Sequence, residues 1–168
     1  MSARMGSETE TEAPHLDKRG ARKTLFLFEL SGEHPTLPAA EAAWCCRAEC
    51  GPCPVLDRGP GYVIMSMPDE AVRPVGERIA LTHRIGRHLL SFDPAEAIRA
   101  VADVELPEGT FAVRVRRQGN NHMGVDCNRL AADIGRVFSK ERKVDLSEPD
   151  VEVRVLLSDR AHLYINCI

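Results

Sequence analysis

The segment that decides the fold is Thr110-Phe-Ala-Val-Arg-Val-Arg-Arg117, in which hydrophobic and basic side chains alternate. Positions 111, 113 and 115 are apolar, whereas positions 114 and 116 are arginines. Strict alternation with a period of two residues is typical of a half-buried strand, because successive side chains point to opposite faces of a sheet. The segment therefore predicts a strand with one apolar face and one basic face.

A helix and a second strand are predicted after this segment. Residues 118–122 are polar and contain Gly and Asn, which tolerate positive φ and suit a turn. Residues 128–142 carry apolar side chains at i, i+4, i+7 and i+8, which is the stripe of an amphipathic helix. Residues 143–150 then lead into a second alternating strand, which begins at Val151.

The first half of the chain predicts a β-α-β-β order. Residues 24–30 are apolar on both faces, which suits a central strand. An alanine-rich segment at 37–48 predicts a helix, with Pro38 tolerated in its first turn. Short strands are predicted at 55–56 and 62–67. This order fits half of a ferredoxin-like unit.

Three further elements are predicted between the two halves. A helix is expected over residues 71–79 and a strand around residues 84–91. A second helix is expected over residues 93–102, with Asp93 as its N-cap and Pro94 at its first helical position. The chain is therefore predicted to belong to the α/β class, of the α+β type.

Three motifs of the second half together resemble a known family. They are Phe111-Ala-Val-Arg-Val-Arg-Arg117, Ala132-Asp-Ile-Gly135 and Val144-Asp-Leu-Ser-Glu-Pro-Asp150. In this order they resemble the THUMP domain, a module of tRNA-modifying enzymes such as 4-thiouridine synthetases and archaeal tRNA guanosine-N(2) methyltransferases. The resemblance covers residues 110–164 and implies a ferredoxin-like region upstream. The expected organisation is a flexible tail at 1–22, a ferredoxin-like region at 23–68 and a THUMP domain at 69–168.

Composition and charge restrict the function classes. The 168 residues have a formal net charge of −3, and 43% of them are hydrophobic and 28% charged, which is typical of a folded globular protein. This overall charge argues against non-specific coating of nucleic acids, but not against a local basic face. Residues 110–143 contain eight basic and three acidic side chains, so that window carries a net charge of +5. Positive charge is therefore concentrated in the second half.

The sequence also indicates a compartment. It contains no apolar run of the roughly 18 residues that a membrane-spanning helix needs, and residues 1–14 lack the apolar core of a signal peptide. We therefore expect a cytoplasmic protein with no membrane partner. In a reducing compartment, the six cysteines are not expected to form a disulfide framework.

The basic window predicts a track for RNA phosphates. Guanidinium groups match phosphate oxygens through paired hydrogen bonds, and positions 129, 136, 140 and 143 are spaced to share one helical face. Amide side chains in the loop at 118–122 suit hydrogen bonds to base edges or 2′-hydroxyl groups, although a turn explains them equally well. A solvated helix face with partners such as Asp133 is the alternative. The predicted RNA-binding residues are Arg114, Arg116, Arg117, Asn120, Asn121, Arg129, Arg136, Lys140, Arg142 and Lys143.

A second basic group lies upstream, at His83, Arg84, Arg87 and His88. No carboxylate or nucleophile is close enough in sequence to form a catalytic dyad with either histidine. The group is therefore interpreted as a solvated face or, if functional, as a set of phosphate contacts.

The cysteine cluster Cys45-Cys46-Arg-Ala-Glu-Cys50-Gly-Pro-Cys53 leaves three interpretations open. Cys50 and Cys53 have the C-x-x-C spacing of zinc and redox sites, and Cys46 lies four residues before Cys50. A four-ligand metal site would have to come from nine residues, however, and thiols are often simply packed in a core. Packed thiols are the main expectation, and a metal site at Cys46, Cys50 and Cys53 or a redox pair are the alternatives.

The motifs of the expected catalytic domains are missing from this sequence. It has no G-x-x-x-x-G-K-S/T loop, and Gly59-Pro-Gly61 does not open a helix as a nucleotide-binding loop would. The Asp/Asn-Pro-Pro-aromatic motif of THUMP-containing methyltransferases is also missing. We therefore expect neither a cofactor nor catalysis in this chain.

The prediction that follows is a tRNA-binding module. The resemblance implies that it grips tRNA near the acceptor stem and 3′ end, and that a separate catalytic subunit, expected to be a methyltransferase, acts on the bound tRNA. Two alternatives stay open. One is a small zinc or redox protein that uses the Cys45–Cys53 cluster, and the other is a protein whose basic face binds an acidic protein. The sequence does not indicate an oligomeric state.

Overall fold

The computed structural model describes residues 23–168, so the tail predicted at 1–22 lies outside the described residues. The described strands form one mixed sheet in the order β2-β3-β1-β4-β7-β6-β5, in which β5 and β6 run parallel and the other neighbours antiparallel. The strands are β1 (Lys23–Leu30), β2 (Val55–Gly59), β3 (Tyr62–Pro68), β4 (Thr82–Phe92), β5 (Phe111–Arg117), β6 (Val151–Leu157) and β7 (Ala161–Asn166). The predicted α/β class is confirmed.

Four α-helices and two short 3₁₀ turns join the described strands. The helices are α1 (Leu37–Cys50), α2 (Val72–Arg78), α3 (Ala97–Ala100) and α4 (Cys127–Phe138), and the turns are η1 (Asp69–Ala71) and η2 (Pro94–Glu96). No described helix has the length and apolar character needed to span a lipid bilayer.

The first half of the described chain has the element order β1-α1-β2-β3-α2-β4, with strand order β2-β3-β1-β4. This is the β-α-β-β-α-β order of a ferredoxin-like unit, completed by α2 and β4. In the second half, α4 connects the parallel strands β5 and β6, and β7 returns to pair with β4. The sheet is continuous through both halves, and the domain boundary at residue 69 stays a prediction.

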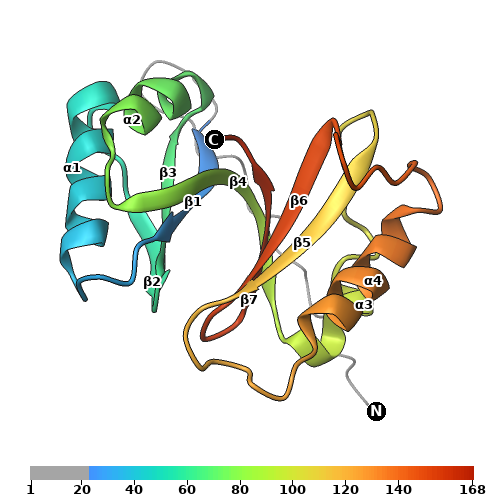
Figure 1. Ribbon diagram of the computed structural model, residues 1–168. Coiled ribbons are helices and arrows are strands. Elements are labelled where there is room, and N and C mark those ends of the chain that lie inside the picture. The colour runs from blue at the N-terminus through green and yellow to red at the C-terminus, as the bar shows by residue number, and fades with distance from the viewer. Residues whose placement is uncertain (1–22) are drawn as a thin grey trace, which may run out of the picture.

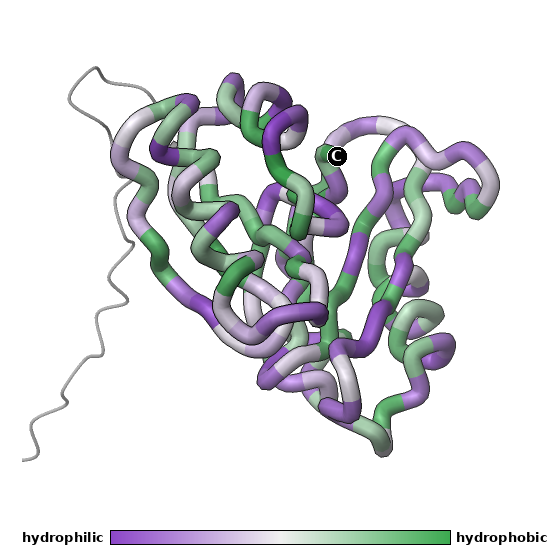
Figure 2. The backbone as a smooth tube through the Cα atoms, turned by 60° about the vertical axis from the view of Figure 1, so that its left-hand side comes forward, coloured by the Kyte–Doolittle hydropathy of each residue, from purple (hydrophilic) through white to green (hydrophobic). Residues whose placement is uncertain are grey.

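All four helices cover the same face of this sheet. Phe28 of β1 is paired with Ile85 of β4, and both belong to the core under α1 and α2. Further along β4, Phe92 is paired with Ala161 of β7, and both belong to the core under α3 and α4. A register shift between His88 and Leu90 keeps these apolar residues of β4 on one face. In β5 and β6, hydrophilic and hydrophobic residues accordingly alternate along part of each strand (Figure 2).

The sheet curves around its other, helix-free face. Figure 1 shows α1 and α2 on one outer side of the molecule and α3 and α4 on the other, with the strands between them. On the inside of the curve, Leu27 of β1 packs in one small cluster with Leu156 of β6 and Tyr164 of β7. Since β4 and β7 separate β1 from β6 in the sheet order, this contact requires strong bending.

Three elements differ from the sequence prediction. The helix predicted over 93–102 is a 3₁₀ turn followed by the one-turn helix α3, although Asp93 caps it as predicted by accepting a hydrogen bond from Ala95 N at 2.9 Å. The helix predicted to end at residue 142 ends at Phe138, where the apolar stripe runs out. Strand β7 is not among the predicted elements.

Candidate nucleic-acid interface

Arg114 and Arg116 of β5 lie on the helix-free face, because Phe111 and Val113 of the same strand face α4. Two further arginines share this face. Arg154 of β6 is the direct neighbour of Arg114 in the parallel ladder, and Arg84 of β4 is paired with Glu29 of β1. The four arginines line one hollow of about 560 Å³, which lies along the outer edge of β5 beside the start of α4.

Arg116 is held in place by a buried carboxylate. Its Nη1 lies 2.5 Å from Oε1 of Glu29, whose side chain is completely buried, and Tyr164 donates its hydroxyl to the other Glu29 oxygen at 2.7 Å. A buried carboxylate is costly unless it is paired in this way. Burial, and then the charge of Glu29, raises the pKa of Tyr164 well above its usual range, so its hydroxyl stays a donor.

Arg154 and Arg114 share a second carboxylate. Nη1 of Arg154 lies 2.8 Å from Oε1 of Glu152, and Nε of Arg114 lies 4.0 Å from the same oxygen. Arg114 also donates to the carbonyl oxygen of Leu146 at 2.6 Å. Arg84 has no ion pair within residues 23–168. Four guanidinium groups therefore face two carboxylates, and positive charge remains for an anionic ligand.

The structure places only two of the four basic residues predicted to share one face of this helix on α4. Arg129 and Arg136 both lie on the exposed side of the helix, but each pairs with Asp133, at 3.9 and 3.0 Å. Lys140 and Lys143 are not on the helix, so the predicted single helical face of four basic residues is wrong. Ser139 follows the last helical residue as the C-cap and donates its hydroxyl to Arg136 O at 3.0 Å.

Three other predicted residues hold loops together. Arg142 donates to the carbonyl oxygen of Leu106 at 3.3 Å, which ties the turn after α4 to the chain before β5. Arg117 donates to Val125 O and so closes the loop between β5 and α4. In that loop, Asn121 donates to Gln118 O at 3.0 Å, as a turn residue would, whereas Asn120 is exposed.

The second basic group is divided by the pleat of β4. Arg84 and His88 lie toward the helix-free face, whereas Arg87 lies on the other face and pairs with Asp69 at 2.9 Å. Only Arg84 of this group lines the hollow with the arginines of β5 and β6. Arg154 was not among the predicted binding residues. It lies in β6, about 40 residues after Arg114, and only the pairing of β5 with β6 in the folded sheet brings the two arginines together.

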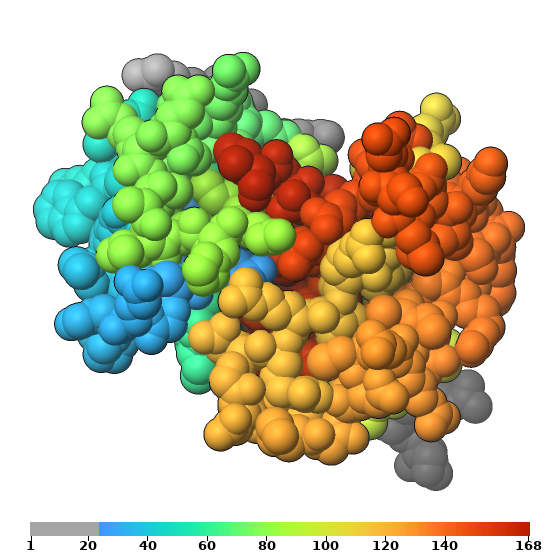
Figure 3. Space-filling view, viewed as in Figure 1, coloured from blue at the N-terminus to red at the C-terminus, as the bar shows by residue number. Residues whose placement is uncertain are grey.

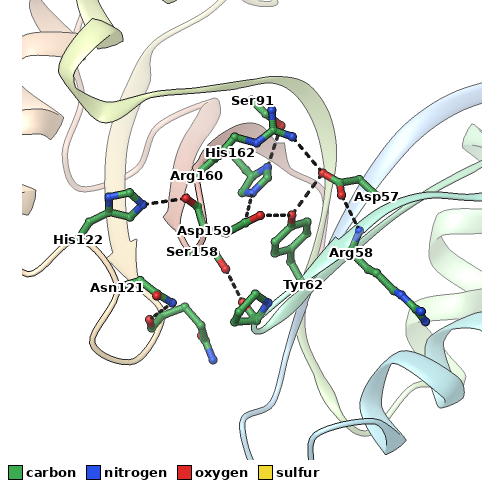
Figure 4. A network of polar contacts seen from close by, with 12 residues as sticks. Asp57, Arg58, Tyr62, Ser91, Asn121, His122, Ser158, Asp159, Arg160 and His162 are labelled. Carbon is green, nitrogen blue, oxygen red and sulfur yellow. Dashed lines mark hydrogen bonds and ion pairs between the residues drawn. The ribbon is translucent and has the colours of Figure 1, made fainter.

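A polar network closes the end of the molecule where the hairpins of the two halves meet (Figure 4). Tyr62 donates to Asp57 at 3.2 Å and to Asp159 at 3.3 Å, and Asp57 also pairs with Arg160. Ser158 donates to the Pro60 carbonyl oxygen at 2.6 Å. These contacts join the β2–β3 turn to the β6–β7 turn, so they hold the curved sheet in shape. Their role is structural.

The cysteine cluster does not form a recognisable metal site. Cys46 is fully buried in the core beneath α1, and Cys50 and Cys53 lie at its edge. Within the described residues, no group of three or more potential ligands is placed to hold a metal ion.

Comparison with known proteins finds a family match in the second half of the chain. Residues 94–166 match the THUMP domain family. Over 137 residues the chain is 30% identical to a tRNA (guanine(10)-N2)-dimethyltransferase of Methanothermobacter thermautotrophicus, an alignment that covers 78% of this chain and 40% of that protein. The chain therefore spans less than half the length of this relative.

Two solved structures share the fold. PH1313 of Pyrococcus horikoshii superposes with a TM-score of 0.57 at 17% identity, over 84% of this chain and 53% of that one. TrmN of Thermus thermophilus superposes with a TM-score of 0.56 at 23% identity, over 86% of this chain and 46% of that one. At these identities the likeness shows the fold alone.

Proposed function

Because residues 94–166 match the THUMP domain family, we propose that this chain is the tRNA-binding module of a tRNA-modification system. The observation that carries the proposal is the hollow along the outer edge of β5, which Arg84, Arg114, Arg116 and Arg154 line together. The relative named above acts on tRNA, which supports tRNA as the ligand.

The hollow suits the sugar–phosphate backbone. Guanidinium groups bind phosphate oxygens through two parallel hydrogen bonds, and here they come from three strands of one sheet, β4, β5 and β6. Glu29 and Glu152 fix two of them before any ligand arrives, so little side-chain freedom remains to be lost on binding. Such a site reads the position of phosphates more than the identity of bases.

Catalysis is proposed to come from elsewhere. The sequence lacks the nucleotide-binding and methyltransferase motifs, and the relative contains a further part that this chain does not match. We infer that this chain positions tRNA, by its acceptor stem and 3′ end, for a separate catalytic subunit of the methyltransferase type. The chain itself then needs no cofactor.

Titration of tRNA binding against salt tests the proposal. Fluorescence anisotropy with labelled tRNA is measured at several salt concentrations for the unmodified protein and for Arg114→Ala/Arg116→Ala. Each lost phosphate contact lowers the slope of log K against log salt by about 0.9 on a duplex and about 0.7 on a single strand. The double variant is therefore expected to bind more weakly, with a slope smaller by about 1.4 to 1.8.

Two further double variants remove the same charge elsewhere and test whether the effect is specific to Arg114 and Arg116. Arg73→Ala/Arg99→Ala removes the same charge from exposed helical positions and is expected to leave the slope unchanged. Arg129→Ala/Arg136→Ala tests whether the exposed side of α4 contributes to tRNA binding, as the sequence predicts. If the unmodified protein does not bind tRNA at low salt, or if the Arg73/Arg99 control loses as much affinity as the Arg114/Arg116 variant, the proposed site is wrong.

A further inference from the structure

Two sulfur atoms at the end of α1 lie unusually close together. Cys50 is the last residue of α1, and its Sγ lies 3.1 Å from Sγ of Cys53. Both side chains are half-buried at the edge of the core beneath α1. A separation of 3.1 Å leaves about 1 Å to travel before a sulfur–sulfur bond of roughly 2.05 Å is reached.

The chain between the two residues is built to bring them together. Gly51 follows the helix with a φ of 80°, a left-handed conformation that glycine adopts without strain and that turns the backbone away from the helix axis. A Cβ atom at this position would meet nothing within 4 Å, so the glycine is required for its conformation and not for space. Pro52 then restricts the backbone on the approach to Cys53.

The third cysteine of the cluster makes the two sulfurs inequivalent. Cys50 donates its thiol proton to the Cys46 carbonyl oxygen at 3.2 Å, an interaction that only the neutral thiol can make. A hydrogen bond with Cys53, followed by burial, raises the pKa of the Cys46 thiol well above its usual range. Cys46 thus remains a thiol, and its Sγ donates to Sδ of Met67 at 3.9 Å. The carboxyl end of α1 also disfavours negative charge on Cys50.

We propose that Cys50 and Cys53 form a dithiol–disulfide site that exchanges with low-molecular-weight disulfides. The Cys53 thiolate attacks one sulfur of the small disulfide, which breaks the sulfur–sulfur bond, forms a mixed disulfide on Cys53 and releases one small thiol. The Cys50 sulfur then attacks Cys53, and the second small thiol leaves. The pair loses two electrons and two protons, and the small disulfide gains them as two thiols.

The location of the pair sets the direction in which this equilibrium lies. In C-x-x-C pairs at the amino end of a helix, the helix dipole stabilises the thiolate and hence the reduced form. Cys50 occupies the opposite end, where this stabilisation is missing. The disulfide form is therefore favoured relative to such pairs, and we expect oxidation at a modest proportion of glutathione disulfide.

The experiment uses the full 168-residue chain, equilibrated in buffers with increasing ratios of oxidised to reduced glutathione. The remaining thiols are then alkylated and the protein is digested with trypsin. Cleavage after Arg47 and Arg58 releases residues 48–58, which contain Cys50 and Cys53 and no other cysteine. The expected product is this peptide without alkylation and lighter by two hydrogens, at ratios that leave the Cys127 and Cys167 peptides alkylated.

Single substitutions test the order of the two steps. In Cys50→Ser, the mixed disulfide on Cys53 cannot be resolved, so glutathione is expected to accumulate on the 48–58 peptide. In Cys53→Ser, the same peptide is expected to gain glutathione several-fold more slowly. Cys45→Ser is the matched control and should oxidise as the unmodified protein does. The proposal is overturned if residues 48–58 are doubly alkylated at every ratio, or if Cys127 oxidises as readily as the pair.

Discussion

At the scale of single residues, the candidate site depends on Glu29. The chain places this carboxylate in an otherwise apolar strand, and the fold buries it completely. Its partner Arg116 lies 87 positions away in sequence, so only the curved sheet brings the two together. Glu29 therefore positions one of the arginines that we propose to bind phosphate.

Glu29→Gln should destabilise the protein by about 3 kcal/mol, as judged by urea unfolding. Removing one partner of a buried ion pair costs about 3 to 5 kcal/mol, and the lower figure applies because the Arg116 side chain is 44% exposed and can be rehydrated. Glu77→Gln is the control, since Glu77 belongs to the exposed pair with Arg73 and should cost less than about 0.5 kcal/mol. Equal losses for the two variants would show that Glu29 does not act as a buried charge.

At the scale of elements, local patterns predicted most helices and strands because each buries one face. The alternation in residues 110–117 predicts a strand, which is β5 in the structure. The apolar stripe that ends at Phe138 predicts a helix, which is α4. The predicted helix runs to residue 142, whereas α4 ends at Phe138, which is its last buried apolar residue. Strand β7 was missed because Ala161–Asn166 is buried on both faces over much of its length and so has no clear alternation.

The candidate site was only partly predictable for a related reason. Charge and strand phase identified Arg114 and Arg116, which lie next to each other on one face of a single strand. They did not identify Arg154 and did not group Arg84 with the arginines of β5, because the neighbours of those residues are set by the order of strands in the sheet. The curvature that turns this face into a hollow is likewise a property of the whole sheet. In Figure 3, the C-terminal residues, in red, lie between the first half of the chain, in blue and green, and the second half, in yellow and orange.

The junction of the two halves within the sheet depends on Gly86 of β4. A Cβ atom here would lie 2.2 Å from Cδ2 of Tyr164 and 2.6 Å from the carbonyl oxygen of Ile165, which belongs to the backbone of β7. Gly86→Ala is therefore expected to destabilise the protein by about 3 kcal/mol in urea unfolding, at the upper end for overpacking. Gly124→Ala, where a Cβ atom would meet nothing within 4 Å, should change stability by less than about 0.5 kcal/mol. If Gly86→Ala left the stability unchanged, β4 and β7 could not be packed as closely as these distances require.

At the scale of the whole molecule, two histidines connect the halves, the half-buried His88 and the fully buried His162. Ser91 of β4 lies 3.1 Å from Nε2 of His88 and 2.8 Å from Nδ1 of His162 in β7, and His162 in turn lies 3.4 Å from Asp159. Burial, followed by the charge of His162, lowers the pKa of His88 to about 4. Burial also lowers the pKa of His162, although the carboxylate of Asp159 opposes this effect. The charged groups that face the pair are Asp57, Asp159 and Arg160.

This arrangement predicts that the protein loses stability in mild acid. The folded form keeps His88 neutral down to about pH 4, whereas the unfolded chain takes up that proton near pH 6.5. Between these values the unfolded state binds more protons, so stability is fully present above about pH 6.5 and declines as the pH falls toward 4. For His88 alone the loss approaches about 3 kcal/mol at the acid end.

Melting temperatures measured between pH 7.5 and pH 4.5 check this prediction. His88→Gln removes the titrating group but keeps a polar side chain, so it should flatten the decline while lowering stability at neutral pH. His83→Gln is the matched control, because His83 lies on the same strand but is exposed, and it should leave the decline as it is. Acid should open the molecule at the junction between β4 and β7, which is where the two histidines meet, and expose the helix-free face. A melting temperature that stays constant from pH 7.5 to 4.5, or that declines equally in His88→Gln, would show that these histidines do not link the two halves.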